Sequence, residues 1–225
     1  FVGFSEVQFF EMGGAIPTSF EWLQDSAGEW KTRNNWTDSF AAPPNQNTAT
    51  AVFGGRITQP TTVVTNAAVT VNRIEFNNAS NSYAIGGLGS VNLAATTSDS
   101  PVDPTIGHGQ GNHQFQAIVN LRGNTTADIA SGSLAFNNAL NLNGKTLTKT
   151  GTGNLVINNH LNTGGGTVDI QQGTVSGNGT IGGDVDNQAV VAPGNSPGVL
   201  SVSGNYTQGA SGVLEIEING TTAGT

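Results

Sequence analysis

The sequence predicts an all-β chain folded as a parallel β-solenoid, and three observations lead to this fold class. A short pattern containing two asparagines recurs along the chain. Most of the sequence alternates apolar with polar residues in short runs, and no segment shows the sustained 3.6-residue apolar stripe of a helix. In a solenoid each repeat forms one coil, and equivalent residues of successive coils lie about 4.8 Å apart, so that like residues form ladders.

The recurring pattern reads apolar, any residue, apolar, Asn, Asn, and it appears as "IEFNNAS", "LAFNNAL" and "LVINNHL". The aligned apolar positions are Phe76, Phe136 and Ile157, which lie 60 and 21 residues apart. These separations are close to three steps and one step of a period near 20 residues. We therefore expect all three side chains to point into the solenoid. An antiparallel sandwich would explain the strand spacing, but it has no reason to repeat this pattern at a near-constant period.

The asparagines that follow these positions are predicted to stack. They are Asn77, Asn137 and Asn158. An amide side chain can both donate and accept a hydrogen bond along a stack, and Asn tolerates the left-handed backbone of a coil corner. The three residues are therefore our candidates for a structural ladder.

Composition excludes several functions. The chain has 225 residues, 32 of them Gly, with 10% charged residues and a formal net charge of −8. Its 7 Lys and Arg residues are scattered singly, whereas binding a phosphate backbone requires clustered cations, so we expect no nucleic-acid partner. No run approaches 18 apolar residues, so no membrane span is expected. The absence of Cys suits an exported bacterial protein held by hydrogen-bonded ladders.

The chain divides into three segments by composition. Residues 1–19 form an N-terminal strand or linker and a possible remnant of a preceding domain, 20–50 a Trp-rich cap, and 51–225 the solenoid repeats. The first coil of a solenoid exposes an apolar end and unpaired strand edges, which a cap must cover. Capping is therefore the first interpretation of the aromatic cluster, and a platform for sugar rings is the alternative. The tryptophans concerned are Trp22, Trp30 and Trp36.

After residue 51, short alternating runs such as "TTVVT", "QAIVNL" and "TVDI" are separated by Gly, Asn or Pro. Residues 145–183, "KTLTKTGTGNLVINNHLNTGGGTVDIQQGTVSGNGTIGG", resemble the autotransporter-associated β-strand repeat of bacterial surface proteins. The stretch "VVAPGNSPGVLSVSGNYTQ", with its two Pro-Gly turns, is similar to the segment that follows such repeats. The resemblance implies a right-handed parallel β-helix and export to the outside or cell surface of a Gram-negative-type bacterium, and it implies no activity. The opening "FVGFSEVQFFEMGG" resembles the closing strand of a discoidin-type domain.

Candidate metal sites are few. His108 and His113 in "GHGQGNH" suggest a metal cluster with Asp103, but the segment reads as a solvated Pro/Gly loop without a framework to fix ligands. Asp184 and Asp186 in "GGDVDN" suggest a calcium loop, but the nonapeptide of calcium-binding β-rolls is absent, and a plain corner is expected. No metal and no cofactor are predicted.

Candidate catalytic groups are equally sparse. Glu215 and Glu217 alternate on one strand face, where two carboxylates can serve glycoside hydrolysis, but we expect them to face solvent. Polysaccharide lyases share the solenoid fold and need a basic residue beside acids or calcium. By sequence, the cations of the repeats have no acidic cluster within their coils. These cations are Arg73, Arg122, Lys145 and Lys149.

The sequence therefore predicts a secreted or cell-surface structural β-solenoid without catalysis, acting as a stalk, adhesin scaffold or fibre subunit. The alternatives are a carbohydrate-binding module that contacts a surface polysaccharide through the aromatic segment and, as a third choice, a lyase-like enzyme. The predicted partners are neighbouring domains or other copies of the chain, joined head to tail through "FVGFSEVQFF" and the uncapped end after "EIEI".

Overall fold

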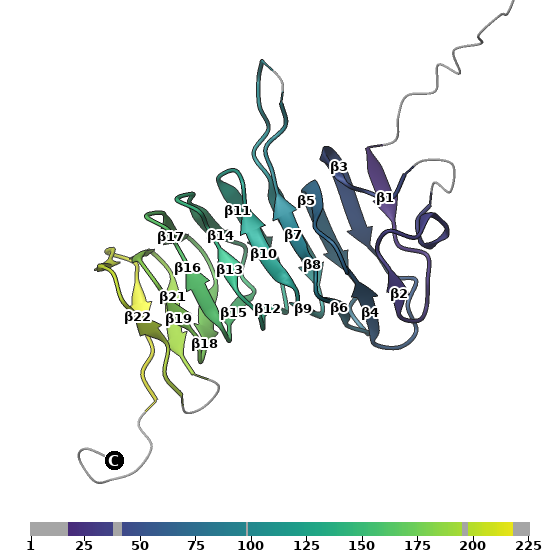
Figure 1. Cartoon of the computed structure of the whole chain (residues 1–225). Helices are drawn as coiled ribbons and strands as arrows, with labels where there is room; N and C mark the ends of the chain where they lie inside the picture. The colour runs from purple at the N-terminus through teal and green to yellow at the C-terminus, as the bar shows by residue number, and fades with distance from the viewer. Residues whose placement is uncertain (1–17, 38–41, 98, 195–197, 218–225) are drawn as a thin grey trace, which may run out of the picture.

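The chain is a parallel β-solenoid of about eight turns, which confirms the predicted fold class. The computed structural model describes residues 18–37, 42–97, 99–194 and 198–217. In these residues there is no α-helix, and one 3-10 turn, η1 (Arg33–Asn35), lies near the start. Figure 1 shows the coils stacked along one axis, from β1 at one end to β22 at the other.

Two sheets form the walls of the solenoid, and every pairing between their strands is parallel. The first is nine-stranded, and each turn of the chain contributes one strand to it. Its members in order are β2 (Gly28–Glu29), β4 (Thr61–Val64), β6 (Tyr83–Gly86), β9 (Asn112–Phe115), β12 (Ser133–Phe136), β15 (Asn154–Ile157), β18 (Thr174–Gly177), β21 (Val190–Pro193) and β24 (Val213–Leu214).

The second sheet is fifteen-stranded and splits into two arms. It begins with β1 (Ser19–Glu21), β3 (Gln46–Phe53) and β5 (Val69–Asn77), and β5 pairs with the first strand of both arms. The first arm contains β7 (Ser90–Leu93), β10 (Ile118–Leu121), β13 (Leu140–Asn141), β16 (His160–Asn162), β19 (Thr180–Ile181) and β22 (Ser201–Val202). The second arm contains β8 (Thr105–Gln110), β11 (Thr125–Ile129), β14 (Leu147–Thr150), β17 (Thr167–Ile170), β20 (Asp184–Asn187) and β23 (Tyr206–Gln208).

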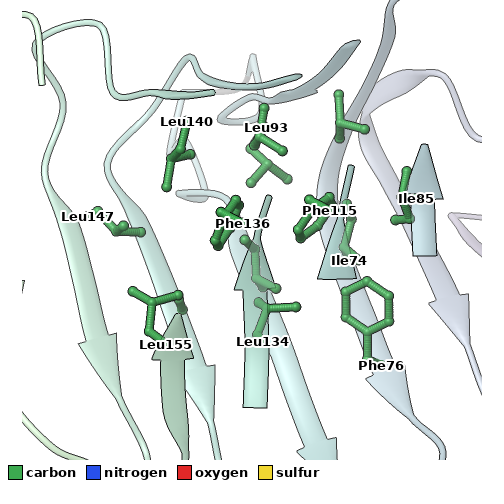
Figure 2. Close-up of a cluster of buried hydrophobic side chains, with 14 of the residues drawn as sticks. Ile74, Phe76, Ile85, Leu93, Phe115, Leu134, Phe136, Leu140, Leu147 and Leu155 are labelled. Carbon is green, nitrogen blue, oxygen red and sulfur yellow. The ribbon is translucent and has the colours of Figure 1, made fainter. Parts of the chain in front are cut away.

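The core follows from the two-residue period of the strands. In β12 and β15 the second and fourth residues are buried and the others face outward, because successive side chains of a strand point to opposite faces. Phe136 pairs in register with Phe115 on one side and Ile157 on the other. The rings of Phe115 and Phe136 stack with centroids 5.0 Å apart. Figure 2 shows this column of apolar side chains between the walls, and each fully buried Phe or Leu contributes about 1.5–3 kcal/mol of transfer free energy.

The predicted inward direction of Phe76, Phe136 and Ile157 is confirmed, since each is 1% exposed. They do not all belong to one ladder, however. Phe76 lies on β5 of the fifteen-stranded sheet, and the position equivalent to Phe136 two turns earlier is Ile85 on β6. The turn between β6 and β9 is longer than the others because residues 94–97 and 99–104 project between β7 and β8 (Figure 1). A separation of 60 residues is therefore not three equal turns.

The segment boundaries predicted from composition fall as follows. β1 and β2 already pair in parallel with β3 and β4, so the Trp-rich segment 20–50 forms part of the first coil. The 50/51 boundary lies inside β3. The segment 1–19, including the strand predicted from "FVGFSEVQFF", lies almost entirely outside the described residues.

Candidate functional site

The three tryptophans form a closed aromatic cluster at the N-terminal end of the solenoid. Trp22, Trp30 and Trp36 are each 0% exposed, and the centroid of the Trp36 ring lies 5.2 Å from that of Trp22 and 5.1 Å from that of Trp30. Each indole N–H donates to a backbone carbonyl: Trp22 to Gln24 (2.9 Å), Trp30 to Pro44 (2.8 Å) and Trp36 to Trp30 (2.7 Å). A sugar ring can stack only on an open aromatic face, so glycan binding here would require the first coil to open.

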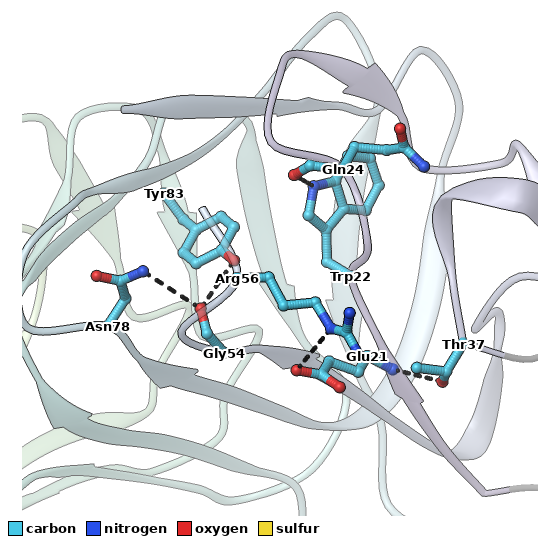
Figure 3. Close-up of polar contacts among 8 residues, drawn as sticks. All are labelled: Glu21, Trp22, Gln24, Thr37, Gly54, Arg56, Asn78 and Tyr83. Carbon is cyan, nitrogen blue, oxygen red and sulfur yellow. Dashed lines mark hydrogen bonds and ion pairs between the residues drawn. The ribbon is translucent and has the colours of Figure 1, made fainter. Parts of the chain in front are cut away.

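Polar contacts hold this end to the next coil. Figure 3 shows the ion pair between Arg56 Nε and Glu21 Oε1, at 3.3 Å. The Tyr83 hydroxyl donates to the carbonyl of Gly54 at 2.9 Å, and Asn78 Nδ2 donates to the same oxygen. Burial raises the pKa of Tyr83 to about 12, because desolvation penalises the phenolate. The aromatic end is therefore closed by both packing and hydrogen bonds.

Two of the three asparagines proposed as a ladder contact each other. Asn158 Nδ2 donates to Asn137 Oδ1 at 2.8 Å, and Asn137 Nδ2 donates onward to Gln114 Oε1 at 2.6 Å. Asn77 is not in this row. It ends β5 in the other sheet, where its register partner is Gln110, because the projecting loop displaces the repeat count.

A second asparagine ladder runs along the first arm, and the sequence analysis missed it. Asn120 Nδ2 donates to Asn92 Oδ1 at 3.2 Å, and Asn141 Nδ2 donates to Asn120 Oδ1 at 2.9 Å. Asn162 occupies the next register position. The signal was present as "VNL", "VNL", "LNL" and "LNT", in which a single Asn follows an apolar residue in each turn.

The prediction of a solvated loop at His108 and His113 is wrong. His108 lies on β8 and His113 on β9, and they are 1% and 2% exposed. Both side chains point into the core beside Phe76, with His centroids 5.1 Å apart. Because glycines lie between the inward-facing positions of this segment, the sequence pattern indicated a loop where the structure has two strands. Asp103 stays exposed on the projecting loop, and the residues that the structure describes contain no cluster of three metal-ligating side chains.

The two core histidines differ in their partners. His113 Nδ1 accepts from the backbone N–H of Tyr83 at 3.0 Å, and Nε2 lies 3.1 Å from the carbonyl oxygen of Gln110, so the ring is neutral with its proton on Nε2. The ring nitrogens of His108 have no hydrogen-bond partner among the described residues. Burial lowers the pKa of His108, and it lowers the pKa of His113 to about 4 with a further contribution from His108.

The remaining carboxylate candidates lie on the outside of the stack. Asp184 and Asp186 belong to β20 and not to a corner, and Asp184 Oδ1 accepts from the backbone N–H of Asn205 at 2.8 Å. Glu215 and Glu217 are exposed and line a hollow of about 290 Å³ beside Ser176. Their exposure agrees with the prediction that they face solvent.

Lys149 is the other group that sequence reasoning misplaced, because it is buried inside the coil. It lies on β14 at an inward position, between Ala127 and Ile170 in register, and is 0% exposed. Its ammonium donates to three backbone carbonyls, those of Thr150 (2.7 Å), Gly151 (2.8 Å) and Gln172 (3.1 Å). Burial lowers the pKa of Lys149 to about 8, and Asp128 opposes this shift.

The Lys149 shift predicts a stability change at alkaline pH. The unfolded chain binds this proton up to the ordinary pKa of 10.5 and the folded chain only up to about 8, so the free energy of unfolding rises between those values. We expect a gain of about 2 kcal/mol between about pH 7.5 and about pH 9.5, measured by urea unfolding. The Lys149→Met variant should lack this rise. An equal rise in the variant would show that Lys149 does not titrate as a buried group.

Two further hollows among the described residues are lined by charged side chains that include cations. The first, of about 260 Å³, lies over β5, β8 and β11 with Gly107 and Gly109 at its base. Glu75 and Asp128 are both register partners of Gly107, so the two carboxylates stand one on each side of it. Arg73 Nε is paired with Glu75 Oε1 at 2.6 Å, so the expectation that the cations of the repeats have no acids beside them is wrong for Arg73. This hollow can accept hydrogen bonds from hydroxyl groups, but its one cation is neutralised.

The second hollow, of about 450 Å³, lies where the corners after β10 and β13 stack. It is lined by Asn120, Leu121, Arg122, Asn143 and Lys145. It contains two cations and no carboxylate, which is unusual on a chain with a net charge of −8. Arg73 is therefore paired with an acid, whereas Arg122 and Lys145 line one hollow from neighbouring coils without an acid beside them.

Among the described residues, the C-terminal end of the stack is apolar and exposed. Val191, Leu200, Val202, Tyr206 and neighbouring side chains line a hollow of about 240 Å³ at the last coil. The larger exposed apolar residues concentrate here, with Val199 at 71% and the others being Val213, Leu214 and Ile216. This end contrasts with the closed aromatic end.

Comparison with known proteins does not place the chain in a family. No family model, no curated protein and no solved structure matches the chain. Among the described residues, no helix is long and apolar enough to cross a membrane.

Proposed function

We propose that this protein is a structural β-solenoid of a bacterial cell surface or its surroundings, serving as a stalk, adhesin scaffold or fibre subunit. The proposal is supported by the resemblance of residues 145–183 to the autotransporter-associated repeat. The observation that carries it is the contrast between the two ends of the stack within the described residues, one closed by Trp22, Trp30 and Trp36 and one with exposed apolar side chains.

The two ends differ in how far their strand edges are covered. Among the described residues, β1 pairs in parallel with β3 and β2 with β4, and residues 35–37 fold back antiparallel over the other edge of β1, where the backbone N–H of Thr37 donates to the carbonyl of Glu21 at 2.9 Å and Trp36 bridges to Trp22. In the described part of the last coil, β22, β23 and β24 each pair only with the preceding coil. A second copy can therefore add strands to the last coil in the same strand direction, and to do so with its first coil it must displace residues 35–37 from β1. Such a head-to-tail contact is heterologous and does not close, so it produces a fibre.

Apolar contacts would drive this stacking. Leu214 and Ile216 border the terminal hollow and are 44% and 62% exposed. Covering them removes apolar area from water at about 25 cal/mol per Å², while the strand edges gain backbone hydrogen bonds. A charge placed at this position would lose its hydration on stacking, which opposes association.

We expect the chain to form linear oligomers whose size grows with concentration, measured by sedimentation velocity. Ile216→Lys should shift the distribution to monomer. Leu88→Lys is the matched control, because Leu88 is 96% exposed on the side of the stack and the same substitution there should leave association unchanged. An intact chain that stays monomeric at all concentrations, or equal dissociation by both variants, contradicts the end-to-end scaffold.

The proposal includes the absence of catalysis. Arg73 is paired with Glu75, Lys149 is buried on three carbonyls, and Arg122 and Lys145 line a hollow without a carboxylate. Among the described residues of the repeats, no unpaired cation therefore stands beside an acid, as lyase chemistry would require. Incubation with pectin or alginate, with and without calcium, should release no unsaturated ends. Turnover that is lost in Arg73→Gln would favour the lyase-like alternative.

A further inference from the structure

The hollow lined by Arg122 and Lys145 differs from the surroundings of the other cations in the described residues, because its cations have no acidic partner. Arg56 and Arg73 form ion pairs with Glu21 and Glu75. Lys149 is buried on backbone carbonyls. Lys31 and Arg33 are exposed in the first coil. Beyond the first coil, the described cations without an acidic partner are Arg122 and Lys145, and both line the same hollow of about 450 Å³.

The hollow has a rigid base because its residues are fixed by bonds between neighbouring coils. The backbone N–H of Arg122 donates to the carbonyl of Leu93 at 2.7 Å, and Asn143 Nδ2 donates to the carbonyl of Leu121 at 3.1 Å. Asn143 has a φ of 51°, a left-handed conformation that Asn tolerates, and this conformation accompanies its corner position. The backbone N–H of Lys145 closes the corner by donating to Leu142 at 2.9 Å.

The surroundings leave the two cations open to a ligand. In the next coil the equivalent corner is Gly164–Gly166, which has no side chains to fill the space. The nearest acid in the chain sequence, Asp128, lies on β11 and lines the hollow at Arg73. Asp99 and Asp103 are exposed between β7 and β8. Neither forms an ion pair with the hollow within the described part of the chain.

We propose that this hollow binds an acidic polysaccharide through the carboxylate of a uronic acid residue. A guanidinium binds a carboxylate with two parallel hydrogen bonds, and the ammonium adds a second charge from the neighbouring coil. The amides of Asn120 and Asn143 can donate to and accept from the sugar hydroxyls. Two cations on an acidic chain suit a single oxyanion and not the dense charge of a nucleic acid. This inference goes beyond the scaffold role and involves a surface distant from the tryptophans.

The net charge of −8 sets the conditions of the test. Distant negative charges repel an acidic polymer, but the Debye length is about 8 Å at physiological ionic strength, so contact pairs keep most of their attraction while distant repulsion is screened. Binding of polygalacturonate should therefore be measured at about 0.15 M NaCl by affinity electrophoresis, with neutral dextran and dextran sulfate as comparison polymers.

We expect the intact chain to bind polygalacturonate and not dextran. Arg122→Gln and Lys145→Gln should each weaken binding about fivefold, and the double variant more than either. Arg33→Gln is the matched control, since it removes an exposed positive charge far from the hollow and should change affinity less than about twofold. Thermal unfolding of each variant checks that the fold is unchanged.

Three results would overturn the proposal: no binding of polygalacturonate, equal weakening by Arg33→Gln, or binding of dextran sulfate alone. None of these depends on association of the chain, so the scaffold proposal and this one can fail separately.

Discussion

Replacing Trp30 by Ala is expected to cost about 3–5 kcal/mol of the free energy of unfolding, the largest single effect that we predict. The Trp30 side chain is 0% exposed and contacts both Trp36 and Phe53, with ring centroids 5.1 and 5.7 Å away. Its removal leaves a cavity at the end of the stack, and the carbonyl of Pro44 loses the indole N–H that donates to it. Urea unfolding followed by circular dichroism measures the loss.

Trp30→Phe provides the control for this prediction. It keeps an aromatic ring in the cluster and removes the hydrogen bond to Pro44, so the expected loss is smaller, about 1–3 kcal/mol. If Trp30→Ala cost less than about 1 kcal/mol, the cluster would not close the end of the solenoid, and an exposed platform for sugar rings would become the better interpretation.

Mild acid is expected to destabilise the fold through His113, by about 2 kcal/mol at about pH 5. The unfolded chain takes up this proton below the ordinary pKa of 6.5, whereas the folded chain does so only near 4. The free energy of unfolding therefore falls progressively as pH falls from 6.5 toward 4, because protonation of His113 favours the unfolded chain. His108 shifts in the same direction and adds to the loss, and Lys149 contributes to the lowered pKa of His108.

The test compares the pH dependence of unfolding in three chains between about pH 7 and about pH 5, a range above the ordinary titration of carboxylates. His113→Gln should flatten the dependence, whatever it does to stability at neutral pH. His160→Gln is the matched control, because His160 is exposed on β16, and it should leave the dependence unchanged. Parallel curves for the intact chain and His113→Gln would show that the histidine is not buried as described.

The fold was predictable from the sequence because the repeat records the stacking directly. Phe136 and Ile157 lie one turn apart and pair in register, and the asparagines that follow them are hydrogen-bonded. The number of turns inferred from the residue separation was wrong at Phe76. A loop inserted into one turn lengthens the separation in sequence without changing which strands pair. Period alone cannot locate such an insertion.

The buried polar groups were harder to predict, although strand alternation pointed to them. In "TIGHGQ" and "LTKT", His108 and Lys149 occupy the same two-residue period as the apolar residues before them. Composition argued against burial, since charged and glycine-flanked residues are typical of surfaces. The charge of Lys149 is tolerated because three carbonyls from two coils meet its ammonium. The hollow at Arg122 and Lys145 was not predictable, because it joins residues from different coils.

Electron microscopy of the purified chain at increasing concentration tests the central claim most directly, namely that the open end of one solenoid is continued by a second copy. We predict unbranched rods whose lengths are multiples of one molecule, with the strand spacing of about 4.8 Å running along the rod axis without interruption at the junctions. Ile216→Lys should give rods of a single molecule's length. Particles of single length at every concentration of the intact chain, or chains associated side by side, would contradict the account.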